Sequence, residues 1–357
     1  MKKVVLILAV FFLPSTLFAQ GENNNWITNH GWFNFNEMEN GKPELLKINT
    51  DTLIYDNAVV SDYDGNLLFF TNGTEVYNKI DKGNIYQLYN GFINPIGWHD
   101  RFDLSTVIIP DRSKENIYYI MQSNCKKRIT IFTVDMMQEN GGGMIVDYDT
   151  IFTNKVIGPL TTTYHKNKRD AWLLALADNE EPDFEFSIFT FKIDLDGINK
   201  SPVISNFQIN QENYPFFNDG VNFIKYIENH ITRFNISNNS DLLGFKFYAG
   251  YNLESISRFF LFKFDNNSGK TFDKIEFSDK IDSTSTIFEE FLFTFSPSGN
   301  FLYTSGISRY DISIWDTTAI KKSKKIIYDI KVKRNEPPLI LNSPDSKIYF
   351  VYSGEND

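Results

Sequence analysis

Histidine and cysteine, the side chains that most often hold catalytic or structural metal ions, are few and scattered in this sequence. The four histidines are His30, His99, His165 and His230, and the one cysteine is Cys125. No two histidines stand at a spacing that would place them on one face of a strand or helix. Because zinc sites usually contain closely spaced ligand pairs, the sequence predicts no metal site.

Adjacent glutamates at 180–181 and 289–290 are the carboxylate pairs that a glycosidase mechanism would call for. Neighbouring residues on a strand point to opposite faces of the sheet, so neither pair forms a two-carboxylate site by itself. The sequence has no Gly-x-Ser-x-Gly elbow, P-loop or dinucleotide-binding fingerprint. We therefore predict no catalytic residue and no cofactor, and a carbohydrate-active enzyme of the sialidase or glycosidase kind is the alternative hypothesis.

Two Asp- and Asn-rich segments are similar to ligand-binding turns of known proteins. Residues 62–66 read like the start of a calcium loop, but an EF-hand needs a bidentate glutamate at the twelfth position, where this chain has Gly73. Residues 267–272 look like one degenerate Asp-box, the hairpin turn that repeats in sialidases. Asp and Gly also recur together at 194–197, which favours ordinary tight turns.

Two aromatic segments are better candidates for ligand contact. One is a polar and aromatic cluster at 98–101, and the other lies in a long insertion at 199–228 that we expect to cap one face of the fold. The residues predicted to bind are Trp98, His99, Asp100, Arg101, Tyr214, Phe216 and Phe217. Aromatic rings supply much of the energy in protein interfaces and in sugar stacking.

The elements that must position these residues are strands. Short runs of Phe, Tyr, Ile and Val are separated by clusters of Asn, Asp, Gly and Ser, without helical spacing. One pattern, a polar turn followed by an aromatic and aliphatic strand, occurs six times, with turns that start at 61, 110, 165, 237, 296 and 343. Between most copies an alternating strand runs into an Asp or Asn turn, as at 129–135, 186–194, 258–265 and 311–316.

A repeat of roughly 50 residues with room for four strands is typical of a propeller blade. We therefore predict an all-β fold, a β-propeller of six four-stranded blades in one domain over 20–357, rather than a pair of β-sandwiches. The hairpin strands at 32–36 and 43–49 could share one blade with the last two strands and close a six-bladed ring. The alternative is a chain truncated at its C-terminus that lacks part of a seventh blade.

The first 19 residues have the layout of a secretory signal peptide. Lys2 and Lys3 precede an apolar run of ten residues, and Ala19 ends the segment with a small side chain before Gln20. Such a run is too short to span a bilayer, and no second long apolar stretch follows. We expect cleavage after Ala19, export through the periplasm, and a mature chain without a transmembrane segment at the outer cell surface or in the medium.

The charge balance excludes one class of partner. The net charge is −10, and the basic residues concentrate only at 321–325, where a solvated turn explains them. Nucleic-acid binding depends on clustered Lys and Arg, so we expect no nucleic-acid partner. A single cysteine allows no internal disulfide, and we expect a monomer stabilised by a large core with a buried thiol at Cys125.

Several segments together resemble one family of exported proteins. They are residues 58–73, 76–78, 108–110, 116–120, 295–303 and 343–349. The first resembles the first blade of large secreted or surface proteins of the Bacteroidetes type, which carry an N-terminal β-propeller, often PKD modules, and a gliding-motility (type IX) secretion signal. The later segments are similar to the turns of WD40-like and TolB-like propellers as well. Nothing in this chain resembles the C-terminal sorting domain of that family.

The resemblance implies secretion or a surface location, with adhesion as a possible role, and it supplies no catalytic residue. Together with the export signal and the absence of catalytic motifs, it favours a non-catalytic binding or scaffold module for an extracellular protein or glycan. Because propellers support both binding and catalysis, the fold alone does not choose between this function and the enzyme alternative.

Overall fold

The computed structural model describes fourteen segments of the chain. They are residues 24–28, 31–46, 58–81, 84–92, 105–123, 128–152, 156–178, 185–209, 231–251, 254–280, 293–304, 308–327, 339–343 and 346–351. The predicted leader at 1–19 and Cys125 lie outside them.

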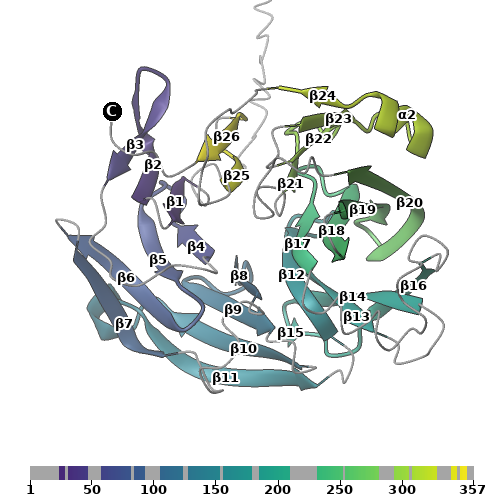
Figure 1. The fold of residues 1–357 in the computed structure, drawn as a ribbon. Coiled ribbons are helices and arrows are strands. Elements are labelled where there is room, and N and C mark those ends of the chain that lie inside the picture. The colour runs from purple at the N-terminus through teal and green to yellow at the C-terminus, as the bar shows by residue number, and fades with distance from the viewer. Residues whose placement is uncertain are drawn as a thin grey trace, which may run out of the picture.

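Six blades of antiparallel strands follow one another along the chain and are arranged in a ring (Figure 1). Blade 1 contains β1 (Asn25–Thr28), β2 (Gly31–Glu39) and β3 (Lys42–Leu46). Blade 2 contains β4 (Ala58–Ser61), β5 (Leu67–Thr71), β6 (Glu75–Asp81) and β7 (Asn84–Phe92). Blade 3 contains β8 (Ser105–Pro110), β9 (Ile117–Ser123), β10 (Arg128–Asp135), the 3-10 turn η1 (Glu139–Gly141) and β11 (Met144–Phe152).

The second half of the chain repeats this plan. Blade 4 contains β12 (Val156–Tyr164), β13 (Ala171–Asp178), β14 (Glu185–Asp194), β15 (Gly197–Ile198) and β16 (Val203–Gln208). Blade 5 contains β17 (Ile231–Ile236), β18 (Leu242–Tyr251), β19 (Glu254–Asp265) and β20 (Lys270–Lys280). Blade 6 contains β21 (Phe293–Phe295), β22 (Phe301–Thr304), β23 (Ser308–Asp311), α2 (Thr317–Lys322) and β24 (Lys325–Ile326). A two-stranded sheet, β25 (Leu339–Asn342) and β26 (Ile348–Val351), follows.

The first strand of each blade lies on the inside of the ring. β1 contacts β4, β4 contacts β8, and the series continues through β12, β17 and β21 to β25. The later strands of each blade pair outward in order, and the outer strands of blades 2 and 3 are joined by one parallel pair between Tyr89 and Met144. The predicted all-β propeller is therefore confirmed.

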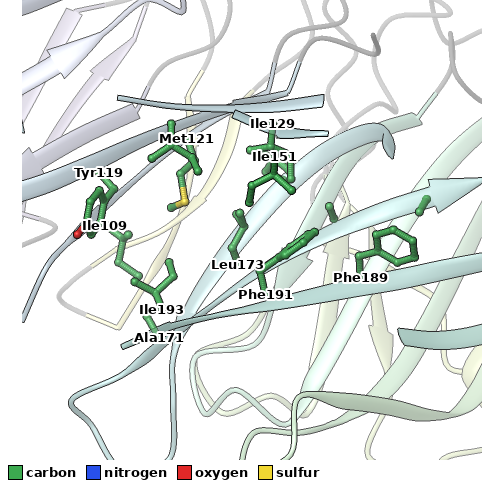
Figure 2. Close-up of a cluster of buried hydrophobic side chains, with 14 residues drawn as sticks. Ile109, Tyr119, Met121, Ile129, Ile151, Ala171, Leu173, Phe189, Phe191 and Ile193 are labelled. Carbon is green, nitrogen blue, oxygen red and sulfur yellow. The ribbon is translucent and has the colours of Figure 1, made fainter. Parts of the chain in front are cut away.

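The hydrophobic core is a series of layers between neighbouring blades. In β13, Trp172, Leu174 and Leu176 pack toward blade 5, whereas Leu173 and Ala175 pack toward blade 3. Alternate side chains on a strand point to opposite faces, so a strand buried on both faces must be apolar at almost every position. Figure 2 shows the layer between blades 3 and 4, where Tyr119 and Met121 of blade 3 face Leu173, Phe191 and Ile193 of blade 4.

Aromatic side chains join the two ends of the ring. Tyr349 on β26 packs edge-to-face against Trp26 on β1 and Phe35 on β2, with ring centroids 5.8 and 5.6 Å apart. On its other side, Asn342 at the end of β25 donates a 2.7 Å hydrogen bond to the carbonyl of Phe295 on β21. In the described residues the terminal strands thus lie between blades 6 and 1 as a separate sheet, and they meet blade 1 through side-chain packing rather than through a shared ladder.

Two sequence predictions differ from the structure. Residues 203–208, part of the predicted insertion at 199–228, form β16, which pairs with β14 in blade 4. The segment 311–316 was expected to be an alternating strand, but β23 ends at Asp311 and the chain then turns into α2. Asp316 caps this helix, because its Oδ1 accepts a 2.8 Å hydrogen bond from the backbone N–H of Ala319. Lys321 and Lys322, expected in a solvated turn, lie in the last helical turn, where the helix dipole favours positive charge.

Candidate binding face

The six polar turns found in the sequence have a common geometry in the structure. Each joins the first and second strands of its sheet and contains a hydrogen bond from the N–H of its fourth residue to the carbonyl of its first. The pairs are Gly65 to Asp62, Lys114 to Asp111, Lys168 to His165, Ser240 to Ser237, Gly299 to Ser296 and Ser346 to Ser343, at 2.7–3.0 Å. We call the surface formed by these turns the turn face.

Hydrogen bonds join several of these turns to the neighbouring blade. In blade 1, Asn25 donates to the carbonyl of Gly65, and in blade 3, Arg112 donates a 2.9 Å hydrogen bond to the carbonyl of Lys168 in blade 4. Farther round the ring, the hydroxyls of Thr163 and Ser240 lie 2.5 Å apart, between blades 4 and 5. These bonds fix the turns relative to the neighbouring blades, so the turn face is preorganised.

A second set of turns follows the third strand of blades 3 to 6. In each, the carboxylate of an aspartate at the end of the strand accepts a hydrogen bond from the N–H two residues later. These aspartates are Asp135, Asp194, Asp265 and Asp311, with distances of 2.9–3.1 Å. Hydrogen bonds from the hydroxyls of Ser268 and Ser313 and from backbone N–H groups lower the pKa of Asp265 and Asp311. The turns predicted at Asp135, Asp194 and Asp265 are therefore confirmed as tight turns, whereas the turn at Asp311 lies where the sequence predicted the start of a strand.

The Asp-box-like turn of blade 5 has a structural role. Trp172 in blade 4 donates a 2.9 Å hydrogen bond from Nε1 to the carbonyl of Asn266, and Asn266 donates one of the same length to the carbonyl of Tyr164. His165 lies 3.1 Å from the carbonyl of Asn267 through Nε2, and its ring packs against Trp172. The backbone carbonyls of this turn and the side-chain amide of Asn266 therefore connect blade 5 to blade 4.

A charged hollow lies between blades 3 and 4 on this face. It is lined by residues 110–113 from the first turn of blade 3, and by residues 169–171 and 193–195 from blade 4. At its base Asp170 is 2% exposed and accepts hydrogen bonds of 2.8 Å from Arg169 and 2.9 Å from Asn167, with Lys192 Nζ also 2.9 Å away. These donors hold the pKa of Asp170 well below its usual range, so its carboxylate is ionised at neutral pH.

The opposite wall of the hollow is built around Asp111. Its buried carboxylate accepts hydrogen bonds from the hydroxyl of Tyr119 at 2.8 Å and from the N–H of Ser113 at 2.9 Å. Burial and this carboxylate together raise the pKa of Tyr119 above its usual value. Next to Asp111, the guanidinium of Arg112 lies 3.6 Å from the centroid of the Tyr164 ring and crosses to blade 4. The two walls are thus linked by a stacked cation.

The binding residues predicted from the sequence lie elsewhere in the chain. Trp98, His99, Asp100 and Arg101 fall in 93–104, and Tyr214, Phe216 and Phe217 fall in 210–230; both ranges are outside the described residues. The same is true of the two glutamate pairs and of every histidine except His165. The seven binding residues therefore stay predictions.

Sequence reasoning missed the charged hollow, although part of it was visible. Residues 165–167 form one of the predicted repeat turns, but nothing in the local sequence links the cations that follow, through Arg169, with the turn that contains Arg112. Within the described segments, no group of three or more His, Cys, Asp or Glu side chains is placed to hold a metal ion. No helix in these segments is long and apolar enough to cross a membrane.

Comparison with known proteins identifies no family. No family model matches the chain, and no curated protein matches it. Among solved structures, Kuenenia stuttgartiensis hydrazine synthase has a TM-score of 0.44 and 11% identity, and the match covers 94% of this chain and 96% of that one. The Vanderwaltozyma polyspora Nup133 β-propeller domain has a TM-score of 0.43 and 10% identity, over 89% and 87%.

A Synechocystis apocarotenoid oxygenase mutant has a TM-score of 0.39 and 11% identity, over 84% of this chain. This match spans 65% of the oxygenase, less than two thirds of its length. The identification of this chain therefore comes from its own sheet topology, and the chain is a β-propeller.

Proposed function

We propose that the protein is an exported β-propeller that acts as a non-catalytic binding or scaffold module for an extracellular protein or glycan. The observation that supports this most directly is the turn face, where hydrogen bonds such as that from Arg112 to Lys168 hold loops of different blades in register. A surface that is ordered before a ligand arrives loses less conformational entropy when it binds one.

The charged groups of this face support a binding role more than a catalytic one. Asp111 and Asp170 are buried and already accept several hydrogen bonds, and those from Arg169 and Asn167 stabilise the ionised form of Asp170 rather than preparing it to take up or release a proton. A general acid or base needs a pKa near the working pH, and the lowered pKa of Asp170 lies in the opposite direction.

Export is proposed from the leader-like N-terminus, and the resemblance of residues 58–73 to secreted Bacteroidetes-type propellers supports it. Expression of the full chain in a Gram-negative host, followed by fractionation and N-terminal sequencing, tests this part. We expect a mature chain that begins at Gln20 outside the cytoplasm. A chain that stays in the cytoplasm with its first 19 residues intact would refute export.

The binding function is tested with the purified chain 20–357 on arrays of extracellular glycans and matrix proteins, together with fluorogenic sialidase and glycosidase substrates. We expect saturable binding to a defined class of ligand and no hydrolysis above a boiled control. Turnover of a glycoside that follows enzyme concentration would instead support the carbohydrate-active alternative.

A further inference from the structure

We propose that the exposed surface of the two turns around the hollow between blades 3 and 4 binds an anionic glycan, a polysaccharide that carries carboxylate or sulfate groups. This inference rests on the proposed binding function and assigns it a place and a ligand class. The site consists of two adjoining turns, 111–116 and 165–170, which Arg112 connects by its hydrogen bond to the carbonyl of Lys168.

These two turns present positive charge to solvent in a chain whose net charge is −10. Five of their cationic side chains are exposed, namely Arg112, Lys114, Lys166, Lys168 and Arg169. Their acidic residues are distributed differently, because Asp111 and Asp170 are buried and only Glu115 is exposed. The outer surface of the two turns is therefore cationic although the sequence of the region is mixed.

Three of these cations are held by neighbouring groups, and in one of them, Lys114, Nζ lies 3.7 Å from the buried carboxylate of Asp111. The guanidinium of Arg112 lies against the Tyr164 ring, and Nε of Arg169 donates to the buried carboxylate of Asp170 at 2.8 Å. Planar guanidinium groups match the geometry of carboxylate and sulfate oxygens, and fixing them beforehand lowers the entropic cost of binding. Both arginines line the same hollow from opposite walls.

The remaining lining residues favour a sugar over an acidic protein segment. Asp194, about a quarter exposed, lies 3.5 Å from Lys192 and offers carboxylate oxygens that can accept hydrogen bonds from sugar hydroxyls. Among the lining residues, Leu195 is the one large apolar side chain that is exposed, whereas protein interfaces usually bury aromatic and aliphatic anchors.

The test is equilibrium binding of the chain 20–357 to polygalacturonate and to dextran sulfate, with neutral dextran and poly-glutamate as comparison ligands, at low and high salt. The variant combines Lys114→Gln, Lys166→Gln and Lys168→Gln. Its matched control combines Lys321→Gln, Lys322→Gln and Lys324→Gln, which removes the same charge from exposed positions in and just after α2. Arg112→Gln is measured separately, because it removes the bridging cation alone.

We expect the wild type and the control to bind at least one polyanionic glycan, and the triple variant to bind it about tenfold more weakly, since each exposed ion pair contributes a few-fold. Added salt should reduce wild-type binding. Preference for polygalacturonate identifies a carboxylate ligand, and preference for dextran sulfate a sulfate ligand. Thermal unfolding of each variant shows that the fold is intact.

Three results would overturn the inference. They are no binding to either polyanion, equal loss of affinity in the triple variant and its control, or equally tight binding of poly-glutamate. If the arrays still show another ligand, the proposed binding function survives while this site and ligand class do not. If neither the arrays nor the polyanions bind, both proposals fail.

Discussion

Replacing Tyr349 with alanine should destabilise the whole ring, because this side chain connects the last described strands with the first. Its ring contacts Trp26 and Phe35 at centroid distances of 5.8 and 5.6 Å, with interplanar angles of 83° and 82°. Each edge-to-face pair contributes about 0.5–1.5 kcal/mol beyond simple burial. The two pairs together therefore contribute about 1–3 kcal/mol.

Burial adds to this figure. Tyr349 is half-buried, so the loss of its ring should expose apolar surface worth about 1 kcal/mol. We expect Tyr349→Ala to lower the free energy of unfolding by about 2–4 kcal/mol, and the melting temperature by several degrees. Tyr349→Phe, which keeps the ring, should lose much less.

The measurement is urea and thermal unfolding of the chain 20–357, followed by far-UV circular dichroism and tryptophan fluorescence. Tyr148→Ala is the matched control, because Tyr148 lies on the outer strand β11 and is 72% exposed. If Tyr349→Ala unfolds at the same urea concentration as Tyr148→Ala, the terminal strands do not stabilise the ring and our account of its closure is wrong.

Two further predictions concern single positions in the turn face. Gly65→Ala should destabilise the fold by about 2–4 kcal/mol, because Gly65 has φ +87° and a Cβ there would collide with the amides of Asn36 and Asn24. Gly197 has φ +97° with open space around it, so Gly197→Ala should cost only the backbone strain and destabilise the fold less in the same urea titration. Equal losses of stability in the two variants would contradict the packing argument. Asp170→Asn should cost about 2–3 kcal/mol at neutral pH, because it leaves Arg169 and Lys192 without their buried carboxylate. Because the pKa of Asp170 is lowered in the folded state, its contribution to the free energy of unfolding is complete above the unfolded-state pKa of about 3.9 and is lost as the pH falls below that value. The difference in unfolding free energy between wild type and variant should therefore narrow in acid. A difference that does not depend on pH would refute this role.

The blade repeat could be predicted because it depends on local backbone chemistry. The turns at 62–66, 237–242 and 296–301 are rich in Gly, Ser, Asn and Asp, which tolerate left-handed backbone angles and form short-range hydrogen bonds. The apolar run of β13 likewise implies burial on both faces, which a propeller provides. Such features belong to a few consecutive residues, so they can be recognised without knowing the neighbours.

The closure of the ring and the helix α2 could not be predicted in the same way. Tyr349 meets Trp26 and Phe35 across more than 300 positions of sequence, and nothing in its local sequence indicates those partners. The segment 311–316 alternates like a strand, but the hydrogen bond from the N–H of Ala319 to Asp316 favours the start of a helix. The N-cap at Asp316 outweighs the weak alternation of apolar and polar residues, because residues 317–322 include the good helix formers Ala and Lys.

The cationic part of the turn face shows why a count of charges misleads in a protein of this kind. The segment 165–170 contains three cations and one carboxylate, and 111–116 contains two of each, so the sequence alone suggests a weakly charged surface. Folding buries Asp111 and Asp170, where Tyr119 and Arg169 satisfy them, and leaves the cations of both turns outside. The surface charge therefore depends on which carboxylates are buried as hydrogen-bond acceptors. That burial is known only from the packed arrangement of the blades. An acidic chain can in this way present a locally cationic surface.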